Sequence, residues 1–175
     1  MLIAPARLQA FVADIFPAAG SARAEADQIA DHLVTSNLKG HDSHGVGLIP
    51  AYLLHLQQGA VFPNRQPKLV SDLGAIVAHD GDSGYGQPIA NAVFDMVGQR
   101  ALETGVVVSS LRNVQHVGRI GAYGEQLALK GLLSIHFVNA VYAQPCVAPF
   151  RGSDARLMKN PVCIAAPIGL DRPPI

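Results

Sequence analysis

The sequence predicts an α/β fold in which a helical N-terminal part precedes alternating strands and helices. Apolar residues recur at helical spacing up to about residue 70, whereas short apolar runs rich in β-branched residues follow from Ala75 onward. Seventeen glycines and twelve prolines separate these segments. We therefore expect a helical domain over residues 1–70 and part of an α/β domain over residues 71–175.

Three helices are expected before residue 70. Apolar residues at helical spacing predict a first helix over residues 5–16, which Pro17 and Gly20 would end. Ser21 is the expected N-cap of a second helix that reaches about residue 37. The third helix is expected from Pro50 to just before Gly59, followed by an extended linker.

The later part of the chain predicts strand, helix, strand, helix and strand in series, then an irregular stretch and a last strand. Strands are expected over residues 75–78, 106–108, 132–138 and 162–167, and helices over residues 90–101 and 121–130. Such alternation builds a sheet covered by helices, with ligands gathering at the carboxyl ends of the strands.

The composition excludes several classes of protein. Thirteen basic and thirteen acidic residues give a formal charge of zero, so the sequence has no basic field that would attract nucleic acid. No apolar run is long enough to span a membrane, and the N-terminus has no signal-peptide pattern. We therefore expect a cytoplasmic protein that binds neither nucleic acid nor membranes.

A polar cluster over residues 40–45 is the first candidate site. It places an alcohol, Ser43, beside an imidazole, His44, which exchanges protons near neutral pH. A helix end followed by a turn would use the same residue types, and this alternative stays open. His41 and His44 could also bind a metal, but no third ligand is suggested, so we expect no metal site.

The second candidate site is the segment over residues 113–121, between an expected strand and an expected helix. His116 could act as an acid or base, and Arg119 could pair with a phosphate or carboxylate. Gly118 and Gly121 would allow close approach of a ligand to the backbone. A loop with a structural histidine and a solvated arginine is the alternative. The glycine spacing does not match the Rossmann fingerprint.

Five segments taken together resemble one family. They are residues 37–46, 80–87, 113–125, 147–150 and 160–161. In this order they resemble the malate/L-lactate dehydrogenase type 2 family, which also contains sulfolactate and ureidoglycolate dehydrogenases. The loop around Gly47, Leu48 and Pro50 resembles the hydroxycarboxylate dehydrogenase branch.

This resemblance implies an oxidoreductase that transfers a hydride between NAD or NADP and the C2 carbon of a small 2-hydroxy or 2-oxo acid. It also implies a family-specific cofactor domain that is distinct from the Rossmann fold, and a homodimer. Ser43 and His44 match the family's serine–histidine pair, and His116 matches a histidine proposed as the acid or base in other members. The loop that lies against the cofactor is matched by Gly118, Arg119, Ile120, Gly121 and Ala122.

The sequence departs from the family pattern at several points. Leu48 replaces an arginine that would bind the substrate carboxylate, so Arg119 is the expected replacement. Lys159 replaces a threonine that contacts the substrate, and we expect it to contact the substrate in turn. Family members are about twice this length, so a second polypeptide could complete the site. An inactive remnant that serves as a binding or oligomerisation module, and a metal-dependent hydrolase built on His41 and His44, are the alternatives.

Overall fold

The computed structural model describes residues 2–141, 144–169 and 174. The chain divides into two units, Met1–Tyr123 and Gly124–Ile175. The expected boundary between residues 70 and 71, which separates a helical from a cofactor-binding domain, stays a prediction.

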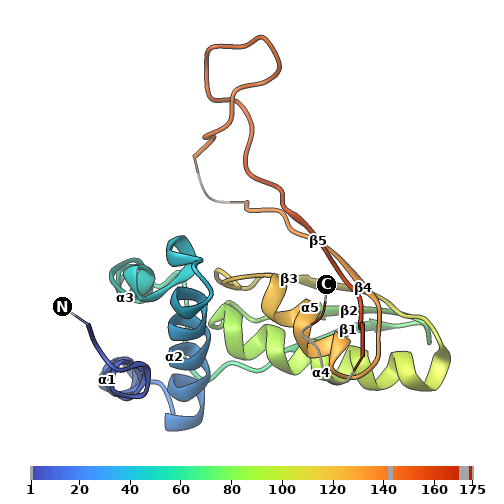
Figure 1. The fold of residues 1–175 in the computed structure, drawn as a ribbon, viewed down its shortest axis with the longest axis horizontal. Coiled ribbons are helices and arrows are strands. Elements are labelled where there is room, and N and C mark those ends of the chain that lie inside the picture. The colour runs from blue at the N-terminus through green and yellow to red at the C-terminus, as the bar shows by residue number, and fades with distance from the viewer. Residues whose placement is uncertain (1, 142–143, 170–173, 175) are drawn as a thin grey trace. The chain divides into compact units, whose positions relative to one another are not determined.

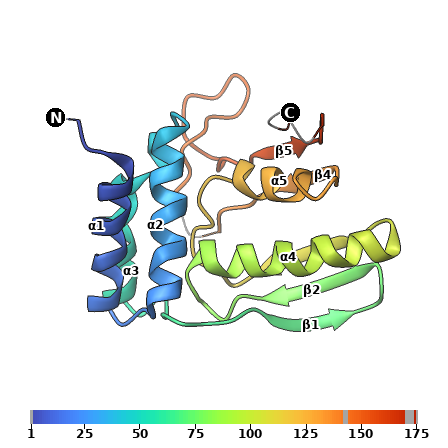
Figure 2. The same cartoon turned by 60° about the horizontal axis from the view of Figure 1, so that its bottom comes forward.

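The first unit begins with three helices. They are α1 (Pro5–Ala18), α2 (Arg23–Leu38) and α3 (Ile49–Gln57), with α1 and α2 packed side by side (Figures 1 and 2). Apolar residues of α1 and α2 at helical spacing form a buried core that includes Phe16, Ile29 and Leu33. The three predicted helices are therefore present.

Two predicted helix boundaries were wrong. Helix α1 continues through Pro17 to Ala18, and the carbonyls of Phe16 and Pro17 accept hydrogen bonds from the two residues after the helix. Ser21 does not cap α2, because the N-cap residue is Ala22. The amide of Ala22 instead donates to Asn64 Oδ1 at 2.6 Å, so the capping oxygen comes from a distant loop.

A three-stranded sheet follows in the order β1 (Lys68–Asp72), β2 (Ile76–Asp80) and β3 (Val108–Arg112). Strands β1 and β2 are antiparallel, whereas β2 and β3 are parallel and are joined by α4 (Gly86–Thr104). Figure 2 shows α4 lying along β1 and β2. Gly105 ends α4 in the left-handed conformation, at φ 81°.

The sequence analysis missed β1 and misplaced β3. Every residue of β1 is exposed, so the strand carries no apolar alternation. The expected strand over residues 106–108 overlaps β3 only at Val108, because pairing with β2 extends β3 through Ser109 and Ser110. Pairing between strands, rather than β-branched residues, sets these boundaries.

Aromatic contacts join the N-terminal helices to the start of α4. Tyr85, at the start of α4, is fully buried and packs edge to face on Phe16 of α1, with ring centroids 5.6 Å apart. Tyr52 of α3 lies 6.2 Å from Tyr85. The core of the three helices therefore includes the first turn of α4.

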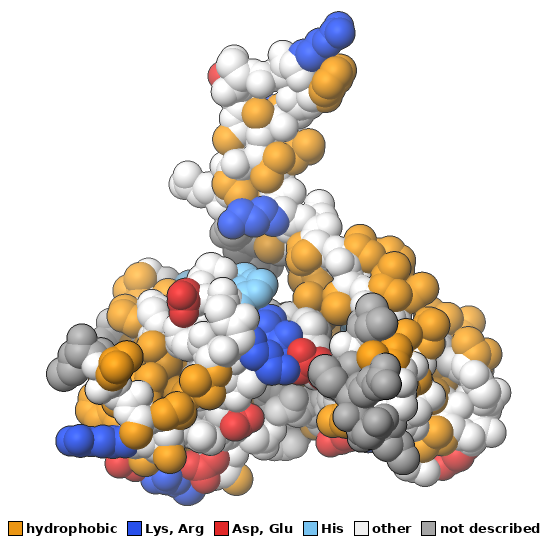
Figure 3. All heavy atoms as spheres, in the orientation of Figure 1, with side chains coloured by type: hydrophobic (Ala, Val, Ile, Leu, Met, Phe, Trp, Pro, Cys, Tyr) orange, Lys and Arg blue, Asp and Glu red, His pale blue; other side chains and the backbone are white. Residues whose placement is uncertain are grey.

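Helix α5 (Gly121–Ala128) continues into the second unit, which contains an antiparallel ribbon of β4 (Ser134–Phe137) and β5 (Val162–Ala165). His136 and Ala165 are buried on one face of the ribbon. The other face exposes Ile135, Phe137, Val162 and Ile164, which form two cross-strand pairs. Hydrophobic side chains gather over β4 and β5 in Figure 3.

Truncation of a buried leucine should destabilise the first unit far more than truncation of an exposed one on the same helix. Leu33 is fully buried, whereas Leu38 is 63% exposed. We expect Leu33→Ala to lower the free energy of unfolding by about 2–5 kcal/mol because it leaves a cavity, and Leu38→Ala to lower it by less than about 0.5 kcal/mol. Urea unfolding followed by circular dichroism measures both, and equal effects would contradict the described core.

Candidate active site

Two short 3-10 helices follow α2 and carry the first candidate cluster. They are η1 (Asp42–His44) and η2 (Val46–Leu48). The side chain of Asn37 joins them, because its amide nitrogen donates to Asp42 and its oxygen accepts the Val46 amide at 2.8 Å. A Cβ atom at Gly45 would overlap this side chain, so only glycine fits there. The loop is therefore held by α2.

The predicted serine–histidine pair is in hydrogen-bond contact in this loop. Ser43 Oγ lies 2.9 Å from His44 Nδ1, and the rings of His41 and His44 lie 4.6 Å apart. Ser43 is exposed and His44 is half-buried, so both are within reach of a small molecule. Their catalytic roles stay predictions.

The structure brings the second predicted histidine to the first. The rings of His44 and His116 lie 5.0 Å apart, although 72 positions separate the residues along the chain. His116 follows β3, and the loop that carries it is anchored by a hydrogen bond from the Gln115 amide to the Gly84 carbonyl at 3.0 Å. A Cβ atom at Gly86 would overlap the backbone of His116, so the close approach requires that glycine.

Tyr52 and Gln87 lie behind His116, and the sequence analysis did not identify them as site residues. The Tyr52 hydroxyl lies 2.9 Å from His116 Nδ1, and Gln87 Nε2 donates to the same hydroxyl at 2.6 Å. Tyr52 and Gln87 are buried. In the sequence, Tyr52 fits the apolar spacing of a helix, and this spacing carries no sign of the contact that its hydroxyl makes.

This environment favours the neutral form of His116. Desolvation of the ring by the atoms packed around it, and then the neighbouring His44 and His55, lower the pKa of His116 to about 4, although the residue as a whole is exposed. Burial raises the pKa of the Tyr52 phenol, and the hydrogen bond from Gln87 opposes this only in part. At neutral pH the site therefore holds an uncharged imidazole against an uncharged phenol.

The predicted cofactor loop leads into α5. Gly118 has φ 77°, and a Cβ atom there would overlap the imidazole of His32. The Arg119 amide donates to His32 Nε2 at 2.8 Å, so α2 holds this loop as well. His32 is a residue that the sequence analysis missed, because its contact spans 87 positions.

The chemistry of this loop fits an anionic group. Helix α5 begins at Gly121, and the amides of Ala122 and Tyr123 donate to the carbonyls of Arg119 and Ile120, so the cation that the loop offers to an anion is the Arg119 side chain. A Cβ atom at Gly121 would lie 2.7 Å from the Arg119 guanidinium, so this glycine makes room for the cation beside the helix terminus. A phosphate group of a dinucleotide suits this guanidinium. The roles of Ile120 and Ala122 stay predictions.

Other candidates lie elsewhere. Lys159 is exposed in the second unit, and its predicted contact with substrate stays a prediction, as does that of Arg119. Within residues 2–141, 144–169 and 174, no group of three or more histidine, cysteine or acidic side chains is arranged to hold a metal ion. Of the helices described, none has the length and apolar character to cross a membrane.

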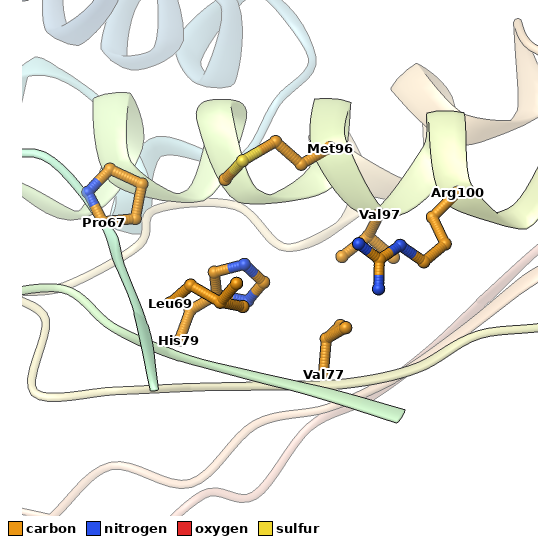
Figure 4. A pocket seen from close by; sticks show the side chains of 7 residues that line it. All are labelled: Pro67, Leu69, Val77, His79, Met96, Val97 and Arg100. Atoms are coloured by element: carbon orange, nitrogen blue, oxygen red, sulfur yellow. The ribbon is translucent and has the colours of Figure 1, made fainter. Parts of the chain in front are cut away.

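A separate hollow of about 120 Å³ lies between α4 and strands β1 and β2. Figure 4 shows His79 and Arg100 reaching into it among apolar side chains. Arg100 is paired with Asp72 and also donates to the Gly74 carbonyl, so it holds the turn between β1 and β2. None of the predicted site residues lines this hollow.

Comparison with known proteins agrees with the resemblance. Residues 3–175 match the model of a family described as malate/L-lactate dehydrogenase. The chain is 42% identical over 160 residues to hydroxycarboxylate dehydrogenase B of Escherichia coli, covering 91% of this chain and 44% of that protein. It is 39% identical over 150 residues to an L-lactate dehydrogenase of Cupriavidus necator, covering 86% and 43%.

Solved structures have the same fold. A putative malate/lactate dehydrogenase from Escherichia coli superimposes with a TM-score of 0.92 at 40% identity, covering 97% of this chain and 47% of that one. Sulfolactate dehydrogenase from Methanocaldococcus jannaschii gives a TM-score of 0.86 at 32% identity, covering 95% and 47%. The chain therefore spans just under half the length of the relatives it matches, and the expected likeness to the hydroxycarboxylate dehydrogenase branch is confirmed.

Adding a methyl group at Gly118 should disrupt the loop that α2 holds. Gly118→Ala forces an alanine into a left-handed conformation and pushes it against His32, whereas Gly105→Ala meets only the conformational cost because its surroundings are open. We expect Gly118→Ala to destabilise the chain by about 1–3 kcal/mol more than Gly105→Ala. Urea unfolding measures the difference, and equal losses would show that His32 does not fill this space.

The stability that His116 contributes should depend on pH. Its pKa of about 4 in the folded chain lies below the ordinary 6.5, so the unfolded chain binds more protons between these values. The contribution is complete above pH 6.5 and is lost as the pH falls toward 4. His116→Gln should flatten the pH dependence of unfolding in urea in this window. His79 and His136, whose pKa values are also lowered, remain in both proteins, and equal slopes would contradict the environment described for His116.

Proposed function

Because the chain belongs to the malate/L-lactate dehydrogenase family, we propose that it transfers a hydride between NAD or NADP and the C2 carbon of a small 2-hydroxy or 2-oxo acid. Its relatives are hydroxycarboxylate, lactate and sulfolactate dehydrogenases, which supports a 2-hydroxyacid oxidoreductase. The proposal includes a cytoplasmic location.

The meeting of His44 and His116 carries this proposal. Reduction of a 2-oxo acid adds a hydride to C2 and a proton to the oxygen on C2, so the protein must present a proton donor at that oxygen. Two imidazoles whose ring centroids lie 5.0 Å apart, with Ser43 against one of them, provide proton-bearing groups within reach of one small molecule. If residues 40–45 formed only a helix end and a turn, nothing would require His116 to lie beside His44.

The charged partners of the reaction, the dinucleotide and the substrate carboxylate, require cationic residues. The loop from Gly118 to Ala122 would hold the phosphates of the dinucleotide, with Arg119 as the counter-charge. When bound, the nicotinamide supplies or accepts the hydride. Since position 48 is leucine, the substrate carboxylate would be bound by Arg119 or Lys159.

We further propose that the chain works with a partner, either a second copy or a second polypeptide that supplies the remaining length of its relatives. The exposed apolar face of β4 and β5 supports this, because its four large side chains are between 53% and 80% exposed. Sedimentation velocity would test it, and a monodisperse monomer with full activity would contradict it.

A fluorescence titration with NADH and NADPH, followed by a panel of 2-oxo acids, tests the function. We expect saturable binding and then oxidation of the bound cofactor. His44→Gln and His116→Gln should each lower turnover by about 100-fold or more, since each removes a proton-bearing group from the substrate oxygen. The control is His79→Gln, in the hollow beneath α4, which should keep wild-type turnover.

Two results would contradict the proposal. A folded, monodisperse sample that binds neither cofactor would favour the inactive binding module. Equal activity of all three histidine variants would show that neither imidazole of the site serves the reaction.

A further inference from the structure

We propose that Gln87 and Tyr52 hold His116 as a neutral imidazole with its proton on Nε2, so that His116 donates a hydrogen bond to the C2 oxygen of the substrate while His44 exchanges the proton. The assignment of the two histidines rests on the proposed function. The tautomer rests on a hydrogen-bonded chain of three side chains, in which Gln87 of α4 and Tyr52 of α3 are buried and His116 lies in the loop after β3.

The direction of the hydrogen bonds begins at Gln87. This residue is fully buried, its Nε2 lies 2.6 Å from the Tyr52 hydroxyl, and its Oε1 has no hydrogen-bond partner among the residues described. Rotating the amide by 180° would place its NH₂ group, with two N–H donors, where Oε1 now lies without a hydrogen-bond partner. A buried carbonyl oxygen tolerates the lack of a partner better than a buried N–H group does. The amide nitrogen therefore faces Tyr52.

The Tyr52 hydroxyl must then donate to His116. Its oxygen accepts the Gln87 amide proton, so its own proton points to the acceptor 2.9 Å away, His116 Nδ1. Burial raises the pKa of the phenol, so Tyr52 keeps this proton at neutral pH. A neutral imidazole that accepts at Nδ1 carries its proton on Nε2.

This arrangement opposes a change of charge on His116. A proton added at Nδ1 would face the Tyr52 hydroxyl, whose proton could not turn toward Gln87 because the amide also donates there. Loss of the Nε2 proton would require Tyr52 to become a phenolate inside the core. His116 therefore suits the role of a fixed hydrogen-bond donor to a developing oxyanion.

His44 is the group that can complete the proton balance. On reduction, C2 gains a hydride, the C=O π bond breaks and its oxygen takes the Nε2 proton of a His44 imidazolium, which becomes neutral. His44 is half-buried rather than enclosed, so it can recover a proton from water. Ser43 lies at its Nδ1 and fixes which ring nitrogen serves the substrate. In the oxidation of a hydroxy acid the same atoms move in reverse.

Nitrogen NMR on the full chain labelled with ¹⁵N-histidine tests the tautomer without cofactor or substrate. We expect the wild-type His116 spectrum to show the proton on Nε2 at pH 7–8. Tyr52→Phe removes the donor to Nδ1, so the spectrum should become a mixture of tautomers and the pKa of His116 should rise by about 1. Tyr85→Phe is the matched control, because that buried hydroxyl has no hydrogen-bond partner within the described structure. Tyr85→Phe should leave the tautomer and the pKa of His116 unchanged.

A wild-type His116 with its proton on Nδ1, or equal effects of Tyr52→Phe and Tyr85→Phe, would overturn the proposal. Gln87→Met provides a second variant should Tyr52→Phe fail to fold, and it should also raise the pKa of His116 because the phenol can then accept from Nδ1.

The pH profile of kcat tests the roles of the two histidines separately from the proposed dehydrogenase activity. We expect one histidine ionisation in the wild type and a second one in Tyr52→Phe. An unchanged profile in an active enzyme would overturn the roles given to His44 and His116. A chain with the expected tautomer and no dehydrogenase activity would contradict the proposed function and the histidine roles, and would leave the tautomer assigned.

Discussion

The hydrogen bond between Gln87 of α4 and Tyr52 of α3 is the contact on which the candidate site depends. It lies where the three N-terminal helices meet the start of α4, and both side chains are buried there. A polar contact in such a place is costly to break, because either partner alone would lose its hydration without compensation. The contact therefore fixes the position of the phenol, and the phenol in turn fixes the imidazole of His116.

The sequence predicts the elements of this arrangement better than their contacts. The helices, the crossover helix α4 and its end at Gly105 follow from local spacing and turn residues. Strand β1 has no such signal because all of its residues are exposed, and the cap of α2 comes from Asn64, which lies far away in the chain. Local sequence patterns show which secondary structure a segment can form. Strand β1 and the cap of α2, in contrast, depend on contacts with segments elsewhere in the chain.

The same distinction applies to the site. Ser43, His44 and His116 are recognisable because polar residues of these types gather in loops next to glycines. Their meeting is not recognisable, since it depends on the side chains of Asn37, Tyr52 and Gln87, each of which fits a helix without any functional role. Gly118 illustrates the limit well. Its sequence context predicts close approach of a ligand, whereas the structure places the imidazole of His32 on the side where a Cβ atom would point.

The two units differ in what they need from their surroundings. The first unit buries Phe16, Tyr52 and Tyr85, and the Tyr52 hydroxyl contacts His116 within the same unit. In the second unit, a ribbon of only two strands carries four large apolar side chains on an exposed face. A two-stranded ribbon that is covered on only one face buries little apolar surface, so burial of the other face against another polypeptide would stabilise the ribbon itself. If another polypeptide covers this face, association and folding of the second unit are a single equilibrium. The candidate site in the first unit, in contrast, is built by contacts within this chain.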